Sequence, residues 1–424
     1  MARFLFLQGP LSTFYSDIAA SLHAEGHEVV KIQLCGNDIN DWQHSGALNY
    51  QGRIEDFEDY LEASFTKPDF KSILLHGDRR PYHVAAIRWA KRHGIQIAVT
   101  ELGYLRPDWM TIEEDAVSAR SHFPSDPKEI RTIAEQCPIP DWAPQFKDKE
   151  SKRILQELRF SFLNLAYKWR FPNYQSHRPH HPLEVYSGWL KRKLSQKKRE
   201  NESIALFQSL IDQKQTFFVF GLQLSGDFQL RDHSPFKDNR EVFEFVFRSF
   251  ANHAPKDTIL VIKPHPLEYQ MHDILSALQT AAQKFNLKDR IKLIDGMSVG
   301  QLTKESLGFL SVNSSAGMES LGIQASTFCV MPTIYDVAGL THAGTIDTFW
   351  TNAKIPDQGL FEALKQAIAG TIQVRGTIYN DDGRMAAAEA IASRLVQKNL
   401  STLISRKVKL RRLEKARVMG VYYD

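Results

Sequence analysis

The sequence has few cysteines and lacks any long apolar segment. Its three cysteines, Cys35, Cys137 and Cys329, are far apart in 424 residues, and none belongs to a CxxC pair or lies at zinc-ligand spacing from a histidine. A disulfide framework and a structural zinc site are therefore both disfavoured. No stretch approaches the roughly 18 apolar residues of a membrane-spanning helix, and the apolar run Phe4 to Leu7 is too short for a signal peptide. We expect a protein of a reducing compartment, located in the cytoplasm.

An excess of one charge is also missing. Lys and Arg number 53 against 49 Asp and Glu, a formal net charge of +4. So small an excess gives no support for a nucleic-acid partner. Hydrophobic residues make up 43% and charged residues 24%, which is typical of a folded globular protein. The length predicts two or three domains.

Several common catalytic motifs are absent from the sequence. There is no Walker P-loop, no GxGxxG after the first expected strand, no HExxH and no GxSxG, so ATP hydrolysis, hydride transfer and serine hydrolysis are disfavoured. His177, His180 and His181 lie close together but lack companion ligands at fixed spacing, and we interpret them as a surface or loop cluster. No metal site and no cofactor are expected.

What the sequence does contain is a regular alternation of short apolar runs and amphipathic segments, which predicts parallel sheets covered by helices. In the first half the expected strands are 4–7, 28–34, 72–76 and 95–100, with helices at 13–23, 82–92 and 151–170. In the second half the expected strands are 216–222, 258–262, 290–294, 308–312 and 327–331, with helices at 241–252 and 273–285 and another beginning near Met318.

This pattern predicts two α/β domains of the Rossmann type, joined near the Lys- and Arg-rich segment 190–202. We expect an N-terminal domain over 1–190, a C-terminal domain over 191–385 and a helical basic tail over 386–424. Two such domains resemble a glycosyltransferase of the GT-B type, in which the site lies in a cleft between the domains. That resemblance of fold does not by itself establish a function.

Polar residues follow several of the expected strands, at the edge where open α/β sheets bind ligands. The sharpest signal is Asn313-Ser314-Ser315 before a helix, which suits either phosphate binding or plain N-capping. Lys263-Pro264-His265-Pro266 follows the strand 258–262 and is either a phosphate-binding segment or only a turn. Asp78, Glu101 and Asp227 are candidate general bases, unless they are simply solvated carboxylates.

Together these segments resemble the bacterial capsular polysaccharide biosynthesis family, and within it the KpsS-type Kdo transferases that begin the lipid terminus of group 2 capsules. The resemblance extends over roughly residues 3 to 350, with the motifs in the same order. The motifs that carry it are Phe4-Leu-Phe-Leu-Gln-Gly-Pro10, His76-Gly-Asp-Arg-Arg-Pro-Tyr-His83, Glu101-Leu-Gly-Tyr-Leu-Arg-Pro-Asp-Trp109, Lys263-Pro-His-Pro266, Asn313-Ser-Ser315 and Tyr335-Asp-Val-Ala-Gly-Leu-Thr-His342.

The resemblance implies an inverting, metal-independent β-Kdo transferase that uses CMP-Kdo and a phosphatidylglycerol-type lipid acceptor. The implied catalytic residues are Glu101 or Asp227 as the base, because Leu102 replaces the second acid of the family's doubled acidic motif, and His265 at the CMP leaving group. The implied donor-binding residues are Gln223, Lys263, Pro266, Asn313, Ser314, Ser315 and Glu319. The implied acceptor-side residues are Gln8, Gly9, Pro10, Asp78, Arg79 and Arg106.

Other readings of the same sequence stay open. The fold also suits a sugar-nucleotide epimerase or a transferase for another CMP-sugar such as sialic acid, and a non-catalytic scaffold of the capsule export assembly is the alternative from another class. The partners to expect are the CMP-sugar, a lipid at the inner membrane surface and other capsule biosynthesis and export proteins, with the chain peripheral on that membrane. The basic segment 406–417 either binds anionic lipid or is a solvated or disordered tail.

Overall fold

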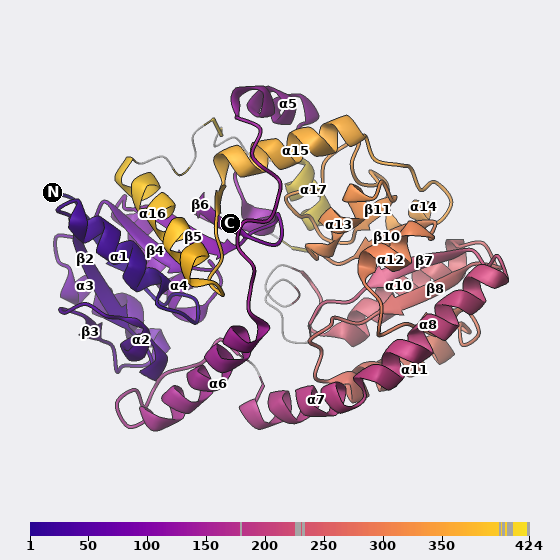
Figure 1. The fold of residues 1–424 in the computed structure, drawn as a ribbon, viewed down its shortest axis with the longest axis horizontal. Coiled ribbons are helices and arrows are strands. Elements are labelled where there is room, and N and C mark those ends of the chain that lie inside the picture. Colours follow the sequence, from indigo (N-terminus) through magenta and orange to yellow (C-terminus); the bar gives the residue numbers. More distant parts are fainter. Residues whose placement is uncertain are drawn as a thin grey trace. The chain divides into compact units, whose positions relative to one another are not determined.

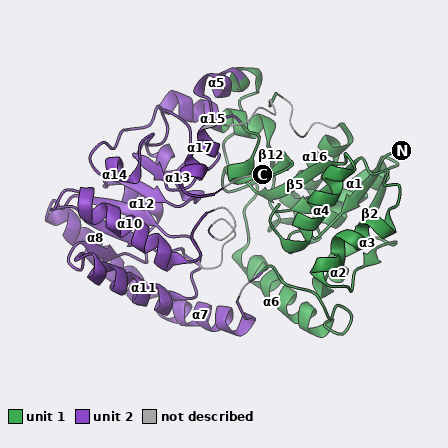
Figure 2. Ribbon diagram, turned by 180° about the vertical axis from the view of Figure 1, so that it is seen from behind, with its two compact units in different colours: residues 1–123, 133–177, 365–408 green, residues 124–132, 178–364, 409–424 purple. Residues whose placement is uncertain are grey.

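The computed structural model describes residues 1–178, 180–224, 230, 234–397, 400, 403–404 and 410–421 (Figure 1). The chain divides into two compact units (Figure 2). Unit 1 consists of residues 1–123, 133–177 and 365–408, and unit 2 of residues 124–132, 178–364 and 409–424. Two helices, α5 (Pro127–Gln136) and α15 (Gln358–Thr371), cross the division.

Unit 1 is built on a seven-stranded sheet with the order β12-β6-β5-β4-β1-β2-β3. Five neighbouring strands are parallel, β6 pairs antiparallel with β5 at one edge, and β12 pairs antiparallel with β6. The strands are β1 (Arg3–Phe6), β2 (Glu28–Gln33), β3 (Leu48–Asn49), β4 (Ser72–His76), β5 (Gln96–Leu102), β6 (Trp109–Glu114) and β12 (Gln373–Arg375). The helices are α1 (Phe14–Ala24), α2 (Gly36–Asp41), α3 (Phe57–Ser64), α4 (Pro81–Arg92), α6 (Glu150–Ala166) and α16 (Asp381–Gln397), with single turns of 3-10 helix at Ile54–Asp56 and Ser118–Arg120.

The core of unit 1 lies on both faces of this sheet, because successive residues of a strand point to opposite sides. Phe4 and Phe6 of β1 pack with α1 and α16, while Leu5 packs on the other face with α3 and α4. Figure 1 shows α1 and α16 in front of the strands. The apolar residues of β1 and β4 are therefore all buried, as expected for strands covered on both faces.

Unit 2 contains a five-stranded parallel sheet with the order β11-β10-β7-β8-β9. Phe218 and Phe220 of β7 pack against α10 and α11, and Phe217 and Val219 pack on the opposite face with α8 and α12. The strands are β7 (Phe217–Gly221), β8 (Ile259–Lys263), β9 (Ile291–Leu293), β10 (Gly308–Ser311) and β11 (Thr327–Cys329). The helices are α7 (Pro182–Leu194), α8 (Gln196–Asp212), α10 (Asn239–His253), α11 (Met271–Lys284), α12 (Val299–Lys304), α13 (Ala316–Gly322), α14 (Ile346–Phe349) and α17 (Leu410–Val418).

The parallel strands of the two units share one topology. In unit 1 the order is β3-β2-β1-β4-β5, and in unit 2 it is β9-β8-β7-β10-β11. Each sheet therefore starts at its centre, extends in one direction and then reverses, which is the Rossmann order. The expected fold class of two Rossmann-like α/β domains is confirmed. The point of reversal lies between β1 and β4 in unit 1 and between β7 and β10 in unit 2, and ligands of such sheets bind outside the carboxyl ends of these strands.

The extents of the two units differ from the ranges expected from the sequence. The long segment of unit 2 begins at residue 178 instead of 191, residues 124–132 also belong to unit 2, and residues 365–408 belong to unit 1 instead of the second domain and the tail. The Lys- and Arg-rich segment near 190–202 is not a linker, because it forms α7 and α8. Antiparallel pairing of β12 with β6 explains the return of the chain to unit 1, since it extends that unit's sheet.

The C-terminal basic segment is helical where the structure describes it, and α17 packs on unit 2. Arg411 Nη2 lies 3.1 Å from Asp336 Oδ1, and Lys415 Nζ lies 3.0 Å from Asp336 Oδ2. Burial opposes ionisation of Asp336, but these two cations outweigh it and lower the pKa of the carboxyl. Arg412 is buried as well. Three of the basic residues that were expected to meet lipid are therefore engaged inside the protein, while Arg406, Lys407, Lys409, Tyr422 and Tyr423 lie outside the described residues.

None of the helices in the described part of the chain is long and apolar enough to span a bilayer.

Candidate functional site

In unit 1, Gln8 follows the central strand β1 and joins the two sides of the topological reversal. Arg80, which follows β4, donates from Nη1 to Gln8 Oε1 at 3.3 Å and to the Gly9 carbonyl at 3.0 Å. Gln8 Nε2 in turn donates to the hydroxyl of Tyr174 at 3.1 Å and to Cys35 Sγ at 3.2 Å. Both ends of the buried amide are thereby paired, and the Arg80 guanidinium is held at the carboxyl end of the sheet.

Gly9 and Pro10, the other expected residues of this segment, are also buried. A Cβ at Gly9 would lie 2.9 Å from the ring of Tyr15, so only glycine lets the chain pass that ring.

The carboxylate of Glu101 lies at the end of β5, next to His76 at the end of β4. His76 Nε2 is 3.7 Å from Glu101 Oε1, and the backbone N–H of Leu102 donates to the same oxygen at 3.0 Å. The Glu101 side chain is 37% exposed, so a substrate hydroxyl can approach it from solvent. Gly77 lies close to it with a φ of +74°, a conformation that favours glycine.

Two opposite pKa shifts occur at this pair. Burial raises the pKa of Glu101, against the opposing effects of the Leu102 N–H and of the Arg80 charge. Burial together with Arg80 lowers the pKa of His76 well below its ordinary value, so the imidazole is neutral near pH 7. Its Nδ1 is 3.0 Å from Thr100 Oγ1, which is also 2.9 Å from the hydroxyl of Tyr15. The result is a carboxyl group of increased basicity, positioned against a neutral polar network.

Asp78, a further candidate base, is buried and faces a cation. Its Oδ2 lies 4.0 Å from Arg120 Nη1, and its side chain is 3% exposed. Burial raises its pKa to about 6, while Arg120 and Arg79 act against that change. Arg79 is half-buried and Arg106 is exposed. Of the two N-terminal carboxylates expected at the site, Glu101 is therefore the accessible one.

In unit 2, Gln223 occupies the place that Gln8 has in unit 1. It follows the central strand β7 and pairs with Asn313, which follows β10. Gln223 Nε2 donates to Asn313 Oδ1 at 2.7 Å, and the Asn313 N–H donates to Gln223 Oε1 at 3.3 Å. Both residues are buried. This double hydrogen bond fixes the ends of β7 and β10 at the reversal point.

The segment after β8 presents a lysine and a histidine. Lys263 is buried and donates to the Pro264 carbonyl at 3.0 Å, and burial lowers the pKa of its ammonium group. His265 Nδ1 accepts the backbone N–H of Leu267 at 3.1 Å, which places the proton of a neutral imidazole on Nε2. Pro266 is exposed, and its carbonyl accepts from Arg192 at 3.3 Å. His265 is therefore held in the tautomer that donates from Nε2.

The serine segment 313–315 uses most of its own polar groups. The helix α13 begins at Ala316, two residues before the expected start. Ser314 Oγ accepts from the N–H of Ala316 at 3.2 Å, and the Ser314 carbonyl accepts from the N–H of Gly317 at 3.1 Å and from the hydroxyl of Tyr335. These helix-start N–H groups already have acceptors, whereas Ser315 is exposed and caps no backbone N–H.

Glu319, on the same helix, is engaged with its neighbour α12. Its Oε1 accepts the backbone N–H of Gly300 at 2.9 Å. Glu319 therefore stabilises the packing of α12 against α13, which was not expected from the sequence. Asp227, the alternative base, lies outside the described residues.

Each unit thus brings part of the expected site together at the end of its own sheet. Sequence reasoning missed the roles of Arg80, His76, Thr100 and Tyr15 around Glu101 and Gln8. The local signal for two of them was present, because His76 and Arg80 belong to the segment that follows the strand 72–76.

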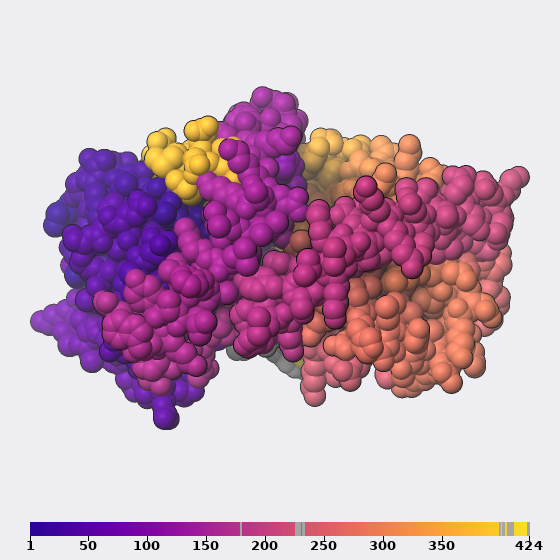
Figure 3. All heavy atoms as spheres, turned by 60° about the horizontal axis from the view of Figure 1, so that its bottom comes forward, coloured from indigo at the N-terminus to yellow at the C-terminus, as the bar shows by residue number. Residues whose placement is uncertain are grey.

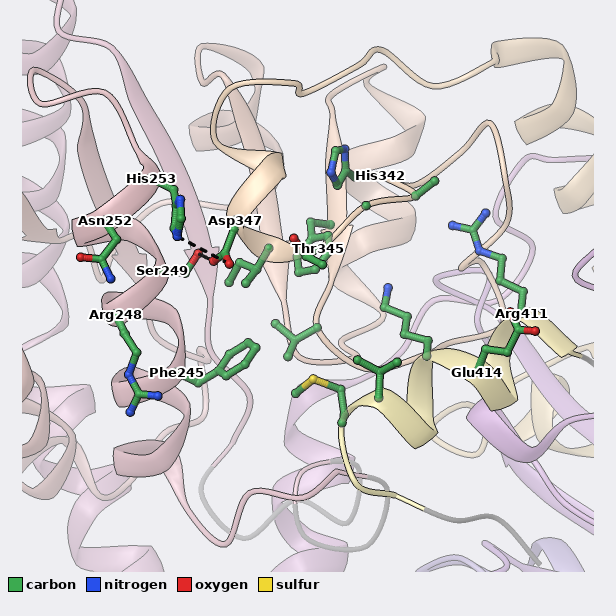
Figure 4. Close-up of a pocket in the computed structure, with 18 residues that line it drawn as sticks. Phe245, Arg248, Ser249, Asn252, His253, His342, Thr345, Asp347, Arg411 and Glu414 are labelled. Carbon is green, nitrogen blue, oxygen red and sulfur yellow. Dashed lines mark hydrogen bonds and ion pairs between the residues drawn. The ribbon is translucent and has the colours of Figure 1, made fainter.

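A cavity of about 640 Å³ lies elsewhere in unit 2, between α10, the segment 342–347 and α17 (Figure 4). Ser249 donates to Asp347 at 2.5 Å, and His253 Nε2 is 3.6 Å from the other oxygen of the same carboxylate. None of the expected site residues that the structure describes lines this cavity. In the described ranges, no group of three or more His, Cys, Asp or Glu side chains is placed to hold a metal ion.

Comparison with known proteins identifies the family. The profile of the family described as "Capsule polysaccharide biosynthesis protein" matches residues 71–379. The chain belongs to the capsule polysaccharide biosynthesis family. It is 30% identical over 380 residues to the capsule polysaccharide export protein KpsS of Escherichia coli, covering 89% of this chain and 97% of that protein. The resemblance inferred from the motifs is therefore confirmed.

Other relatives of this capsule protein are similar over most of their length. The capsule polysaccharide modification protein LipB of Neisseria meningitidis serogroup A is 28% identical over 393 residues, covering 89% of this chain and 91% of that protein. Among solved structures, the β-Kdo 2,7 transferase KpsC of Thermosulfurimonas dismutans is 13% identical, with a TM-score of 0.43 over 94% of this chain and 99% of that one.

Proposed function

We propose that this capsule protein is a glycosyltransferase that moves a β-Kdo residue from CMP-Kdo to a phosphatidylglycerol-type lipid, and so starts the lipid linker of the polysaccharide. The observation that carries the proposal is Glu101, an accessible carboxylate with a raised pKa at the end of β5. Membership of the capsule polysaccharide biosynthesis family supports a role in capsule synthesis. The identities of the donor and the acceptor are taken from the resemblance of the motifs.

In the proposed reaction the acceptor hydroxyl attacks the anomeric carbon of Kdo from the face opposite the leaving group. The hydroxyl proton passes to Glu101, the new glycosidic bond forms, and the bond to the CMP phosphate breaks with inversion. The raised pKa of Glu101 favours this role, because a general base works best when its pKa is near the operating pH. His76 is a positioning residue, since it stays neutral and lies 3.7 Å from the carboxylate.

The leaving CMP gains negative charge, and unit 2 offers groups that suit it. His265 donates from Nε2 because Nδ1 is occupied by the Leu267 N–H. Lys263 adds a buried positive charge near the same strand end. Hydrogen bonds and cations aimed at a developing oxyanion lower the barrier substantially in a site shielded from water. The Ser315 hydroxyl is the remaining contact that we assign to the phosphate.

On this proposal no divalent cation is needed, because Lys263 and His265 offset the phosphate charge. We therefore expect the transfer rate with a chelator such as EDTA to stay within about twofold of the rate without it. A change of that size is what a small change in ionic strength can cause. Loss of activity in EDTA that Mg²⁺ or Mn²⁺ restores would contradict this part of the mechanism.

The acceptor side is assigned to unit 1, around Gln8, Arg79 and Arg106. A lipid acceptor places the enzyme at the cytoplasmic face of the inner membrane as a peripheral protein. Other capsule biosynthesis and export proteins are the partners we expect there, since the product is their substrate.

The experiment that tests the proposed function combines purified protein, CMP-Kdo and a short-chain phosphatidylglycerol, with mass spectrometry of the lipid product. We expect a mass increase of one Kdo residue, and no product when CMP-sialic acid replaces CMP-Kdo. Product from CMP-sialic acid alone would support a transferase for another CMP-sugar.

The alternative that the protein is a non-catalytic scaffold of the capsule export assembly is tested in cells. Full capsule production by a strain that carries Glu101→Gln and His265→Ala together would favour a non-catalytic scaffold over an enzyme.

A further inference from the structure

The helix α6 in unit 1 carries a continuous apolar face that no other described segment covers. Its members are between 46% and 76% exposed. They are Ile154, Leu155, Leu158, Phe162 and Leu165 on the helix and Trp169 in the turn that follows it. At 3.6 residues per turn these positions fall within an arc of about 100°. We call these six residues the α6 stripe.

The opposite face of α6 accounts for the packing of the helix on its own unit. Phe160 and Gln156 are buried, and the backbone N–H of Asn37 donates to Asn164 Oδ1 at 3.2 Å. A Cβ at Gly36 would lie 2.3 Å from the Leu163 carbonyl, so glycine lets α2 approach α6 closely. The helix is therefore fixed in a single orientation, and the α6 stripe faces away from the core of unit 1.

Apolar side chains of this size on a soluble protein surface mark a contact with another molecule. Such side chains favour binding because the contact removes them from water, and the stripe contains Phe and Trp together with Ile and Leu. No charged residue interrupts it between positions 154 and 165 on the exposed arc. Simple solvation is therefore a poor explanation for the α6 stripe.

The charge around the stripe indicates what it contacts. Residues 147–170 contain seven Lys and Arg against three Asp and Glu, a net charge of +4 that equals the net charge of the whole chain. Lys147, Lys149 and Lys168, near the two ends of the helix, are exposed. Lys152 and Arg159, on one flank, form ion pairs with Asp381 and Asp41 and so stay close to the protein. An apolar face with Trp and Phe, bordered by cations, is the composition of a helix that lies in an anionic lipid interface.

The helix α7 in unit 2 repeats this combination. Leu183, Leu190 and Leu194 are exposed on it, and Lys191 and Lys193 are exposed beside them. Gly188 and Arg192, on its other side, are buried, and Arg192 forms a double hydrogen bond with Asp295 at 2.8 Å. An apolar and basic helix face is thus present in each unit.

We propose that the α6 stripe is the surface by which the protein docks on an anionic lipid bilayer, with Phe162, Leu165 and Trp169 entering the interface. The choice of a lipid surface rests on the proposed function. Vesicle binding is measured without donor or turnover, so failure of docking and failure of the transferase reaction are separate results. In the described part of the C-terminal basic segment, Arg411, Arg412 and Lys415 are engaged in unit 2, so we place the docking surface on the α6 stripe.

The test is co-sedimentation of the full chain with vesicles of phosphatidylcholine that contain phosphatidylglycerol. The combined variant Phe162→Ser, Leu165→Ser and Trp169→Ser is expected to bind at least tenfold more weakly than the unchanged protein. A matched control replaces Ile139 and Ile355 with serine, since both are 75% exposed and lie outside α6. The control is expected to bind within twofold of the unchanged protein, and both variants to melt at its temperature.

Two further measurements distinguish contact with an anionic lipid surface from recognition of one headgroup. Vesicles with phosphatidylserine carry the same charge without the proposed acceptor headgroup, and equal loss of binding by the stripe variant on both vesicles supports a surface contact. The tryptophan fluorescence of the unchanged protein is expected to shift to the blue on these vesicles, and most of that shift to disappear in Trp169→Phe. Vesicle binding by the stripe variant at the level of the unchanged protein would overturn the proposal. So would a lipid-free dimer in sedimentation analysis that the stripe variant abolishes, since the occupant would then be a second copy of this chain.

Discussion

The two units share one strand order but differ in the chemistry at the reversal point. Each has a glutamine two residues after its central strand, Gln8 in unit 1 and Gln223 in unit 2. Gln8 binds a charged partner, Arg80, and at the nearby strand ends the pKa of Glu101 is raised while that of His76 is lowered well below its ordinary value. Gln223 binds the neutral Asn313, and the strand end beside it presents Lys263 and His265.

The difference shows how one topology supports two tasks. Burial raises the pKa of Glu101 in unit 1, which prepares a carboxylate to accept a proton. In unit 2 a neutral amide pair fixes the strand ends, and Lys263 and the Nε2 of His265 are the groups that we assign to the phosphate. We infer that unit 1 handles the proton of the acceptor and unit 2 handles the phosphate of the donor.

The largest expected effect comes from removing the proton acceptor of unit 1. Glu101→Gln keeps the size of the side chain but cannot accept a proton, so the transfer rate is expected to fall by roughly 10²- to 10⁴-fold. Initial rates with CMP-Kdo and a short-chain phosphatidylglycerol measure this. The control Glu25→Gln changes a surface carboxylate and is expected to keep the full rate. A Glu101→Gln enzyme with more than a tenth of the normal rate would remove Glu101 from the mechanism.

The corresponding change in unit 2 is His265→Ala. It removes one donor to the developing phosphate charge, and a loss of about 10²- to 10³-fold in kcat is expected for such a donor. Saturating donor separates this loss from weaker binding, and an unchanged melting temperature excludes unfolding. Near-normal turnover of His265→Ala at saturating donor would show that another group serves the leaving phosphate.

The pH dependence of the rate sharpens the contrast between the units. On the proposed mechanism the transfer needs Glu101 deprotonated, and burial raises its pKa above the ordinary 4.5. The value of kcat/KM is therefore expected to fall about tenfold for each unit of pH below that raised pKa, as for any single essential base. In a profile measured from pH 4 to 9, this fall of kcat/KM toward low pH is expected to begin above pH 4.5. The residual rate of Glu101→Gln is expected not to show this fall. If the fall persists in the variant, it arises from another ionisable group.

The smallest effect is on stability and concerns Asp78, the buried carboxyl of unit 1. Its pKa is about 6 in the folded protein against the ordinary value of 3.8, so the folded state prefers the protonated form. This contribution to stability is complete below pH 4 and is lost as the pH rises through 6. Relative to Asp78→Asn, the wild-type protein is expected to lose about 2–3 kcal/mol of unfolding free energy between pH 4 and pH 8. Urea unfolding at both pH values measures it, and equal changes in the two proteins would contradict a raised pKa.

Most of the strands follow from local sequence patterns, whereas several helices were not predicted. The apolar run Ser72 to His76 and the amphipathic segment after it predicted β4 and α4 closely, because the two periodicities are distinct. The strands β3, β6 and β12 were missed. Glu113 and Glu114 interrupt the apolar pattern of β6, and β12 is three residues long and pairs with a strand more than 250 residues earlier.

The candidate site was predictable only in part, because some of its contacts also join residues that are far apart in the sequence. Glu101 and His265 follow expected strands and are visible in the sequence. The pairs Arg80 with Gln8 and Gln223 with Asn313 join residues that are 72 and 90 positions apart, and no local pattern reports such contacts. The orientation of α6 also depends on a distant residue, Gly36, so the sequence predicted the helix but not its exposed face.

The division of tasks between the units is tested most directly by the affinity of CMP for three forms of the protein. Isothermal titration calorimetry with CMP would compare the unchanged protein, Glu101→Gln and His265→Ala under one set of conditions. We expect Glu101→Gln to bind CMP within twofold of the unchanged protein and His265→Ala to bind it about tenfold or more weakly, as for loss of a hydrogen bond to a charged group. Weaker CMP binding by Glu101→Gln together with unchanged binding by His265→Ala would contradict this division of tasks.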